Sequence, residues 1–194
     1  MEAPVVSGPR VLLRGWRDND LEAFARLNED PEVMKHFPRA LSREESDAMV
    51  RERIAEHFSE HGFGLWAVEV PGVATFIGFV GLQAPPFEAR FTPCVEVGWR
   101  LAREHWGHGY ATEAGRVALD FGFESVGLEE IVSFAPLVNS RSIAVMQRLG
   151  MRPDGTFDHP RLADGHPLRP HVLYRLQRSR HAAQGDSAAP QAMR

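Results

Sequence analysis

Residues 106–114 read Trp-Gly-His-Gly-Tyr-Ala-Thr-Glu-Ala and are the most informative feature of the sequence. Gly107 and Gly109 stand between an apolar, β-like run over 95–101 and a helical pattern over about 112–123. A backbone without Cβ atoms at the start of a helix brings several N–H groups and the positive end of the helix dipole to one point. The turn therefore predicts an anion site for a phosphate or pyrophosphate, although a Gly-x-Gly turn alone also fits a plain strand-to-helix connection.

The composition is that of one globular domain. The chain has 194 residues, of which 43% are hydrophobic and 25% charged, and its formal net charge is −4. This negative charge argues against nucleic acid as the main partner and is compatible with a cationic substrate. Cys94 is the only cysteine, which excludes an intrachain disulfide and a cysteine-based metal cluster. The sequence shows neither a secretory signal pattern nor an apolar run near the ~20 residues that span a bilayer, so we expect no membrane contact and a cytoplasmic location.

The spacing of apolar residues predicts a mixed α/β order. Ser42 with Glu45 forms a capping box, Asn139 caps a later helix, and Gly62 and Gly150 mark helix ends. We expect residues 1–178 to form one domain and residues 179–194 a disordered tail. The expected strands are 10–16, 65–70, 75–82, 95–101, 130–135, 151–157 and 172–176, and the expected helices are 18–27, 31–37, 42–61, 112–123 and 139–149.

Three sequence blocks in this order make the pattern specific. They are Val95-Glu96-Val97-Gly98-Trp99-Arg100-Leu101, residues 106–114, and Asn139-Ser140-Arg141-Ser142 followed by Gly150-Met151. Over residues 10–176 the chain resembles the GNAT family of N-acetyltransferases, and more closely its RimJ/RimL branch, which often carries a tryptophan where Trp106 stands. The resemblance implies a mixed α/β GNAT fold, with a mostly antiparallel seven-stranded sheet flanked by about four helices.

The resemblance also implies acetyl-CoA as co-substrate and an amine as acceptor. The strand over 95–101 would splay from its neighbour and pair with the pantetheine amides, and Gly98 would mark a bulge or close approach unless it merely relieves packing. N–H groups near the glycine turn would hold the pyrophosphate, and Asn139 would bind the pantetheine arm. The expected cofactor-binding residues are Val97, Gly98, Trp99, Trp106, Gly107, His108, Gly109, Tyr110, Ala111, Thr112, Asn139 and Ser142.

Acetyl transfer to an amine requires a base that removes a proton, donors for the oxyanion, and a proton for the leaving thiolate. Glu96 alternates with Val95 and Val97, and it is the first candidate for the base, although it could instead pair with Arg100 on the same face. The N–H of Val97 or Gly98 would stabilise the oxyanion. Many GNAT enzymes place a tyrosine proton donor where this chain has Met146, so Ser142 or water is the expected donor.

The acceptor is expected to enter between the helices over 18–61 and the irregular segment over 158–170. The candidate substrate-binding residues are His36, Phe37, Phe63, Trp66 and His171, and the two histidines are also alternative bases. The histidines and aspartates of 158–171 fit no standard metal spacing, so we expect no metal. A protein N-terminus and a small-molecule amine remain open as acceptors, as do another short acyl group, a catalytically idle CoA-binding module and a homodimer.

Overall fold

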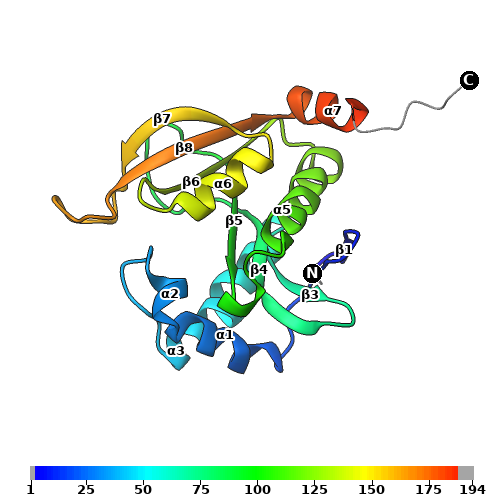
Figure 1. Ribbon diagram of the computed structural model, residues 1–194, viewed down its shortest axis with the longest axis vertical. Coiled ribbons are helices and arrows are strands. Elements are labelled where there is room, and N and C mark those ends of the chain that lie inside the picture. Colours follow the sequence, from blue (N-terminus) through cyan, green and yellow to red (C-terminus); the bar gives the residue numbers. More distant parts are fainter. Residues whose placement is uncertain (1–2, 188–194) are drawn as a thin grey trace, which may run out of the picture.

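The computed structural model describes residues 3–187, which form one mixed sheet covered by helices (Figure 1). The strands are β1 (Val6–Ser7), β2 (Leu12–Arg14), β3 (Leu65–Val70), β4 (Ala74–Gln83), β5 (Glu96–Leu101), β6 (Glu130–Pro136), β7 (Arg152–Asp158) and β8 (Pro170–Gln177). The helices are α1 (Asp20–Glu29), α2 (Pro31–Met34), α3 (Arg43–Ala48), α4 (Ala55–His61), α5 (Tyr110–Asp120), α6 (Ser140–Arg148) and α7 (Arg178–Ser187). No helix among these residues combines the length and apolarity that crossing a membrane requires.

The sheet has the strand order β1-β2-β3-β4-β5-β6-β8-β7, and only β5 and β6 run parallel. The expected mostly antiparallel sheet is therefore confirmed, with one strand more than the seven predicted. The additional strand is β1, a two-residue edge strand that pairs with Leu12 and Leu13 of β2. A run of two residues has no period, so the sequence pattern could not reveal it.

Helix boundaries follow the predicted caps. The Ser42 hydroxyl accepts from the Glu45 N–H while the Glu45 carboxylate accepts from the Ser42 N–H, so the capping box is present. α3 continues through a π-helical segment, η1 (Met49–Ile54), into α4, which ends at Gly62 with φ of 73°. α5 continues in the same way through η3 (Phe121–Val126). These single turns of wider helix leave the predicted amphipathic patterns intact.

The two faces of β5 point to different helices. In the β4–β5 ladder Leu82 lies opposite Val97, and the Leu82 side chain packs at Gly122 in the extension of α5. Side chains alternate along a strand, so Glu96, Gly98 and Arg100 share the opposite face, where Arg100 contacts α1. Figure 1 shows β5 in the middle of the molecule, between the α1–α3 part and the part that holds β6, β8, β7 and α6.

The segment expected to be a disordered tail begins as helix α7 in the structure. His181 in this helix lies 5.0 Å from the Phe123 ring, centroid to centroid, and pairs with Asp120 of α5. Residues 188–194, the remainder of that expected tail, lie outside the described residues. The helix packs through one aromatic contact at its start, which a composition-based argument does not detect.

Candidate active site

β5 parts from β6 almost as soon as the two strands meet. On one side β5 pairs with β4 over all six of its residues, from Glu96 to Leu101. On the other side it pairs with β6 at the single position Glu96–Val132, next to a hydrogen bond from the Val132 N–H to the Val95 carbonyl of 2.9 Å. Beyond this point no strand among residues 3–187 pairs with that edge of β5. Its free N–H and C=O groups can pair with an extended amide-bearing chain.

The glycine turn at the start of α5 has the backbone conformation that the sequence predicts. Gly107 and Gly109 both have φ of 83°, and Gly109 is the N-cap residue of α5. Among the described residues no side chain caps this helix, so its first N–H groups have no such partner. The Trp106 indole N–H donates to the Leu101 carbonyl at 2.8 Å, which ties the turn to the end of β5. A helix start with these uncapped N–H groups has the chemistry that binds an anion.

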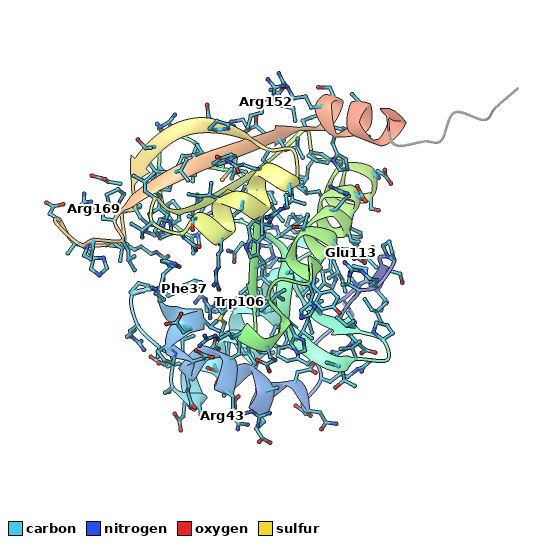
Figure 2. All side chains as sticks on the ribbon, viewed as in Figure 1. Phe37, Arg43, Trp106, Glu113, Arg152 and Arg169 are labelled. Atoms are coloured by element: carbon cyan, nitrogen blue, oxygen red, sulfur yellow. The ribbon has the colours of Figure 1, made fainter. Side chains whose placement is uncertain are left out.

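The beginning of α6 faces this turn. Asn139 caps α6 through a hydrogen bond from the Ser142 N–H to its Oδ1 at 3.2 Å, so the predicted cap is present. The Arg141 guanidinium lies 4.6 Å from the Trp106 ring centroid. α6 and the glycine turn therefore approach each other at the place where β5 and β6 diverge, and Figure 2 labels Trp106 in this central part of the molecule.

Glu96 lies at the point where the two strands part. Its side chain is buried, with 8% of the residue exposed, and its Oε2 accepts from the Gln83 amide at 2.9 Å. Burial raises the pKa of Glu96 to about 8, and the hydrogen bond from Gln83 opposes this rise. The alternative pairing with Arg100 is not formed, because the Arg100 guanidinium is turned toward Phe37 and Asn28. A carboxyl with this pKa changes charge near neutral pH, as a general base requires.

Gly98 leaves open space in front of this carboxyl. The β4–β5 ladder runs through Gly98 without a register shift, so no bulge is present there. A Cβ atom at Gly98 would lie 3.7 Å from Glu96 Oε1 and 3.9 Å from the Gln83 amide nitrogen. The glycine therefore leaves space beside Glu96, and its backbone conformation is not one that favours glycine.

The candidate acceptor residues fall into two groups. His36 and Phe37 are half-buried at the end of α2, and Phe37 covers the guanidinium of Arg100 at 4.0 Å. His171 is buried on β8, where its ring lies 5.5 Å from Phe157, and its Nδ1 is 3.0 Å from the Arg169 carbonyl. Burial lowers the pKa of both His36 and His171, which weakens the expectation that either is the base.

Phe63 and Trp66 have a different place from the predicted one. Trp66 is fully buried in the main core, where it packs on Phe58 and Phe121 and donates to the Pro4 carbonyl at 2.8 Å. Phe63 is also buried. Aromatic residues at strand starts fill the core more often than they line pockets, and in this structure both residues do so.

A sequence model of the acetyltransferase (GNAT) domain matches residues 10–152 of this chain. The chain belongs to the GNAT family. It is an acetyltransferase, and the enzymes of this family use acetyl-CoA. An uncharacterized protein of Bacillus subtilis, YkkB, is 31% identical over 145 residues, which are 73% of this chain and 81% of YkkB.

Two solved GNAT structures have the same fold. RimJ of Mycobacterium smegmatis, in complex with CoA-disulfide, has a TM-score of 0.73 at 21% identity and covers 95% of this chain and 98% of its own. Spermidine N-acetyltransferase of Vibrio cholerae, in complex with CoA and spermine, has a TM-score of 0.70 at 20% identity and covers 89% of this chain and 98% of its own. At these identities the likeness establishes the fold alone.

The usual donor position in this GNAT enzyme carries no acidic proton. Met146 is fully buried in the main core. Ser142 lies one turn closer to the start of α6, is half-buried, and its hydroxyl forms no hydrogen bond with any of the described residues. Ser142 therefore stays the side-chain candidate for the proton donor, with water as the alternative.

The cluster of histidines and aspartates near the β7–β8 connection has its own partners. Asp158 and Asp164 both pair with Arg169. Among residues 3–187 no group of three or more potential ligands is placed to hold a metal ion.

Sequence reasoning did not identify Gln83 and Asn28, whose contacts with Glu96 and Arg100 depend on the β4–β5 register and on the packing of α1.

A methyl group at Gly98 should reduce activity without harming the fold. In Gly98→Ala the new Cβ would lie in ordinary contact with Glu96 Oε1. If Glu96 is the base, an amine or its bridging water would have to fit at this place. We expect kcat/KM to fall about tenfold or more, since displacement of reacting groups by even ~1 Å is costly. Thermal unfolding should show a midpoint equal to or above that of the wild type, because alanine loses less backbone entropy than glycine. An unchanged kcat/KM would mean that acceptors do not approach this face.

Proposed function

We propose that this GNAT enzyme transfers the acetyl group of acetyl-CoA to a primary amine, by direct attack within a ternary complex. The acceptor would be a protein N-terminal α-amine or a small-molecule amine. The observation that carries the proposal is the buried Glu96 carboxyl, with its raised pKa, at the point where β5 leaves β6. The CoA and the polyamine named for the two related structures are consistent with it.

Acetyl-CoA would lie along the open edge of β5. The edge over Val97, Gly98 and Trp99 would pair with the pantetheine amides, while Asn139 and Ser142 at the start of α6 would contact the same arm from the other side. The pyrophosphate would sit on the N–H groups at the start of α5. The residues of this turn are Trp106, Gly107, His108, Gly109, Tyr110, Ala111 and Thr112.

The chemistry needs two proton transfers. Glu96, directly or through water, would take a proton from the ammonium, and the free amine would then attack the thioester carbonyl carbon. The N–H of Val97 or Gly98 would stabilise the negative charge on the carbonyl oxygen. The C–S bond then breaks, and the thiolate receives a proton from Ser142 or from water. The amide and free CoA leave, so that no covalent enzyme intermediate is formed.

The acceptor would approach the Glu96 face of β5. His36 and Phe37 at the end of α2 would form one wall, and the segment around His171 the other. We assign acceptor selectivity to these two segments. Phe63 and Trp66 have no part in it.

The test is thiol release from acetyl-CoA with a panel of amines, which includes peptides with a free N-terminus, polyamines and amino acids. Amine-dependent release supports the acetyltransferase. CoA binding without thiol release from acetyl-CoA, whichever amine is present, favours the idle module. Thiol release from succinyl-CoA or another short acyl-CoA, but not from acetyl-CoA, would indicate a different acyl donor. Absence of CoA binding would contradict the assignment of the glycine turn.

Ser142→Ala separates the two candidate proton donors. If the hydroxyl protonates the thiolate, we expect kcat to fall about 10- to 100-fold, at the lower end of what general acids contribute. Ser140→Ala is the matched control, since Ser140 is exposed in the same helical turn. Equal kcat values for the two variants would assign the proton transfer to water.

A further inference from the structure

Arg100 is a buried cation without a carboxylate. It lies on β5 with 9% of the residue exposed, and no acidic side chain among residues 3–187 forms an ion pair with it. Its guanidinium carbon lies near two aromatic rings, 4.0 Å from the Phe37 centroid and 5.4 Å from the Phe79 centroid. Burial lowers the pKa of Arg100 to about 10, which reflects the same lack of a partner.

Arg14 shows how this fold otherwise treats a buried arginine. Arg14 is 2% exposed, and its guanidinium contacts two carboxylates, Asp20 at 2.7 Å and Glu69 at 2.8 Å. Both residues are on strands that face the α1 layer, but only Arg14 has its charge neutralised within the chain. A buried charge without a counter-charge destabilises the folded state, so the absence of a carboxylate beside Arg100 calls for an explanation.

A chain of hydrogen bonds holds the Arg100 guanidinium in place. Its Nη1 donates to Asn28 Oδ1 at 2.6 Å, the Asn28 amide donates to the Ser46 hydroxyl at 3.0 Å, and that hydroxyl donates to the Ser42 carbonyl at 2.8 Å. Arginine is only a donor, which fixes the oxygen of Asn28 toward it. The chain contains neutral groups alone, so it orients the charge and does not neutralise it.

The opposite edge of the guanidinium has no hydrogen-bond partner among residues 3–187. Nη1 is occupied by Asn28, while Nε is buried without a hydrogen-bond partner, and Nη2 donates to none of the described residues. Nε–H and one Nη2–H point in the same direction, and this edge matches the two oxygens of a carboxylate. An anion on this edge would pair with the charge that the described part of the chain leaves without a carboxylate.

Arg100 shares a strand face with Glu96, and Gly98 lies between them without a side chain. Four residues of strand separate their Cα atoms by about 13 Å, at ~3.3 Å per residue. Figure 2 labels Phe37, which covers Arg100, in the central region between α1–α3 and α6. An acceptor that contacts both groups would therefore have to span about this distance along the face.

We propose that Arg100 binds a carboxylate of the acceptor, so that the substrates are amines that carry a carboxylate several bonds away. The proposal rests on the acetyl transfer proposed above for the identity of the amine end. It assigns substrates such as ω-amino acids or short peptides with an acidic second or third residue. CoA is not the partner, because Arg100 lies on the face opposite Val97 and α5.

The test uses a ladder of ω-amino acids of increasing length, each compared with its own carboxamide, in the thiol-release assay. For the ω-amino acid whose length spans the distance from Glu96 to Arg100, we expect wild-type kcat/KM to exceed that for its carboxamide by about 10- to 100-fold. This ratio is typical of a hydrogen bond to a charged group. In Arg100→Gln this ratio should collapse toward one, mainly through KM. Arg103→Gln, which removes an exposed arginine just beyond β5, should keep the ratio.

A binding measurement separates this proposal from the reaction itself. With CoA in place of acetyl-CoA no transfer occurs, and calorimetric titration of the same ladder should show the same preference and the same loss in Arg100→Gln. If circular dichroism shows that Arg100→Gln does not fold, Arg100→Lys serves instead. Lysine keeps the positive charge but lacks the two parallel N–H donors of the guanidinium, so this variant should lose most of the preference for carboxylate over carboxamide. Carboxylate binding that depends on Arg100 without any turnover would support this site and contradict the proposed reaction.

Two results would overturn the proposal. One is a wild type with no carboxylate preference at any length, in either assay. The other is a preference that survives in Arg100→Gln. CoA affinity serves as an internal check, because weaker CoA binding in Arg100→Gln, with an unaltered ratio, would place the anion partner on the cofactor.

Discussion

Glu96→Gln should lower kcat/KM for amines by roughly 10²- to 10⁴-fold, the usual contribution of a general base. Glutamine has nearly the same shape and keeps the contact with Gln83, so the loss would report the missing base and not a changed site. The rate of the wild type should rise with pH through about 8, because the carboxyl must be ionised to accept a proton. The variant should lack this rise and show only residual activity that increases further into the alkaline range.

The same substitution should stabilise the protein at alkaline pH. The folded-state pKa of Glu96 is raised from about 4.5 to about 8, so its stabilising effect is complete below about pH 4.5 and is lost as the pH rises toward 8. The difference corresponds to on the order of 5 kcal/mol at pH 9. Glu96→Gln avoids this loss, and its Tm should exceed that of the wild type by roughly 5 °C or more at pH 9.

Thermal unfolding at about pH 5 and pH 9, together with pH–rate profiles, checks both effects. Glu124→Gln is the control, because Glu124 is an exposed carboxylate in η3, remote in sequence from β5. A Tm difference between wild type and Glu96→Gln that stays constant with pH would show that Glu96 is not a buried, protonated carboxyl. Wild-type activity in Glu96→Gln would exclude it as the base.

Gly109→Val should weaken CoA binding more than about 100-fold, since we propose that the pyrophosphate binds at this turn. The φ of 83° at Gly109 disfavours any residue with a Cβ by ~1–2 kcal/mol, and a Cβ atom there would lie 3.5 Å from the Arg10 guanidinium, beside the start of α5. Calorimetric titration with CoA measures the loss, and thermal unfolding measures the accompanying strain.

Gly127→Val separates strain from binding. Gly127 has φ of 80° and ends η3, and a Cβ atom there would meet nothing within 4 Å beyond its chain neighbours. Its substitution therefore imposes similar backbone strain far along the same helix. We expect similar Tm losses in the two variants but normal CoA affinity in Gly127→Val. Equal losses of CoA affinity would attribute the effect to backbone strain and not to the glycine turn.

Much of the fold could be predicted because the caps and periods of this chain are local. Ser42 with Glu45, Asn139 and Gly62 each act on their own helix, and the structure confirms these helix ends. The single pairing between β5 and β6 was expected only from the family resemblance, because no property of either strand alone determines where two strands part. The two-residue β1 is too short to have a pattern.

The candidate site was less predictable, since its distinguishing contacts join distant segments. Trp66 and Phe37 are both aromatic residues near helix or strand ends, yet one fills the core and the other covers Arg100. Glu96 and Arg100 are close in sequence, and their spacing on one face allowed an ion pair. The pair is absent because Asn28, which is far away in the sequence, holds the arginine in another direction.

The single pairing of Glu96 with Val132 has a mechanical consequence for the whole molecule. All eight strands belong to one sheet, but the backbone ladder that makes a sheet unfold as a unit is nearly interrupted at its centre. Cooperativity between the two halves must then rest more on side-chain packing than on the ladder, because α5 contacts α6 and Val97 of β5 and Met146 of α6 share one hydrophobic core. A ligand that lies between β5 and β6 would supply the missing ladder hydrogen bonds. We therefore expect ligand binding to change the shape of the protein little and to make its thermal unfolding transition sharper.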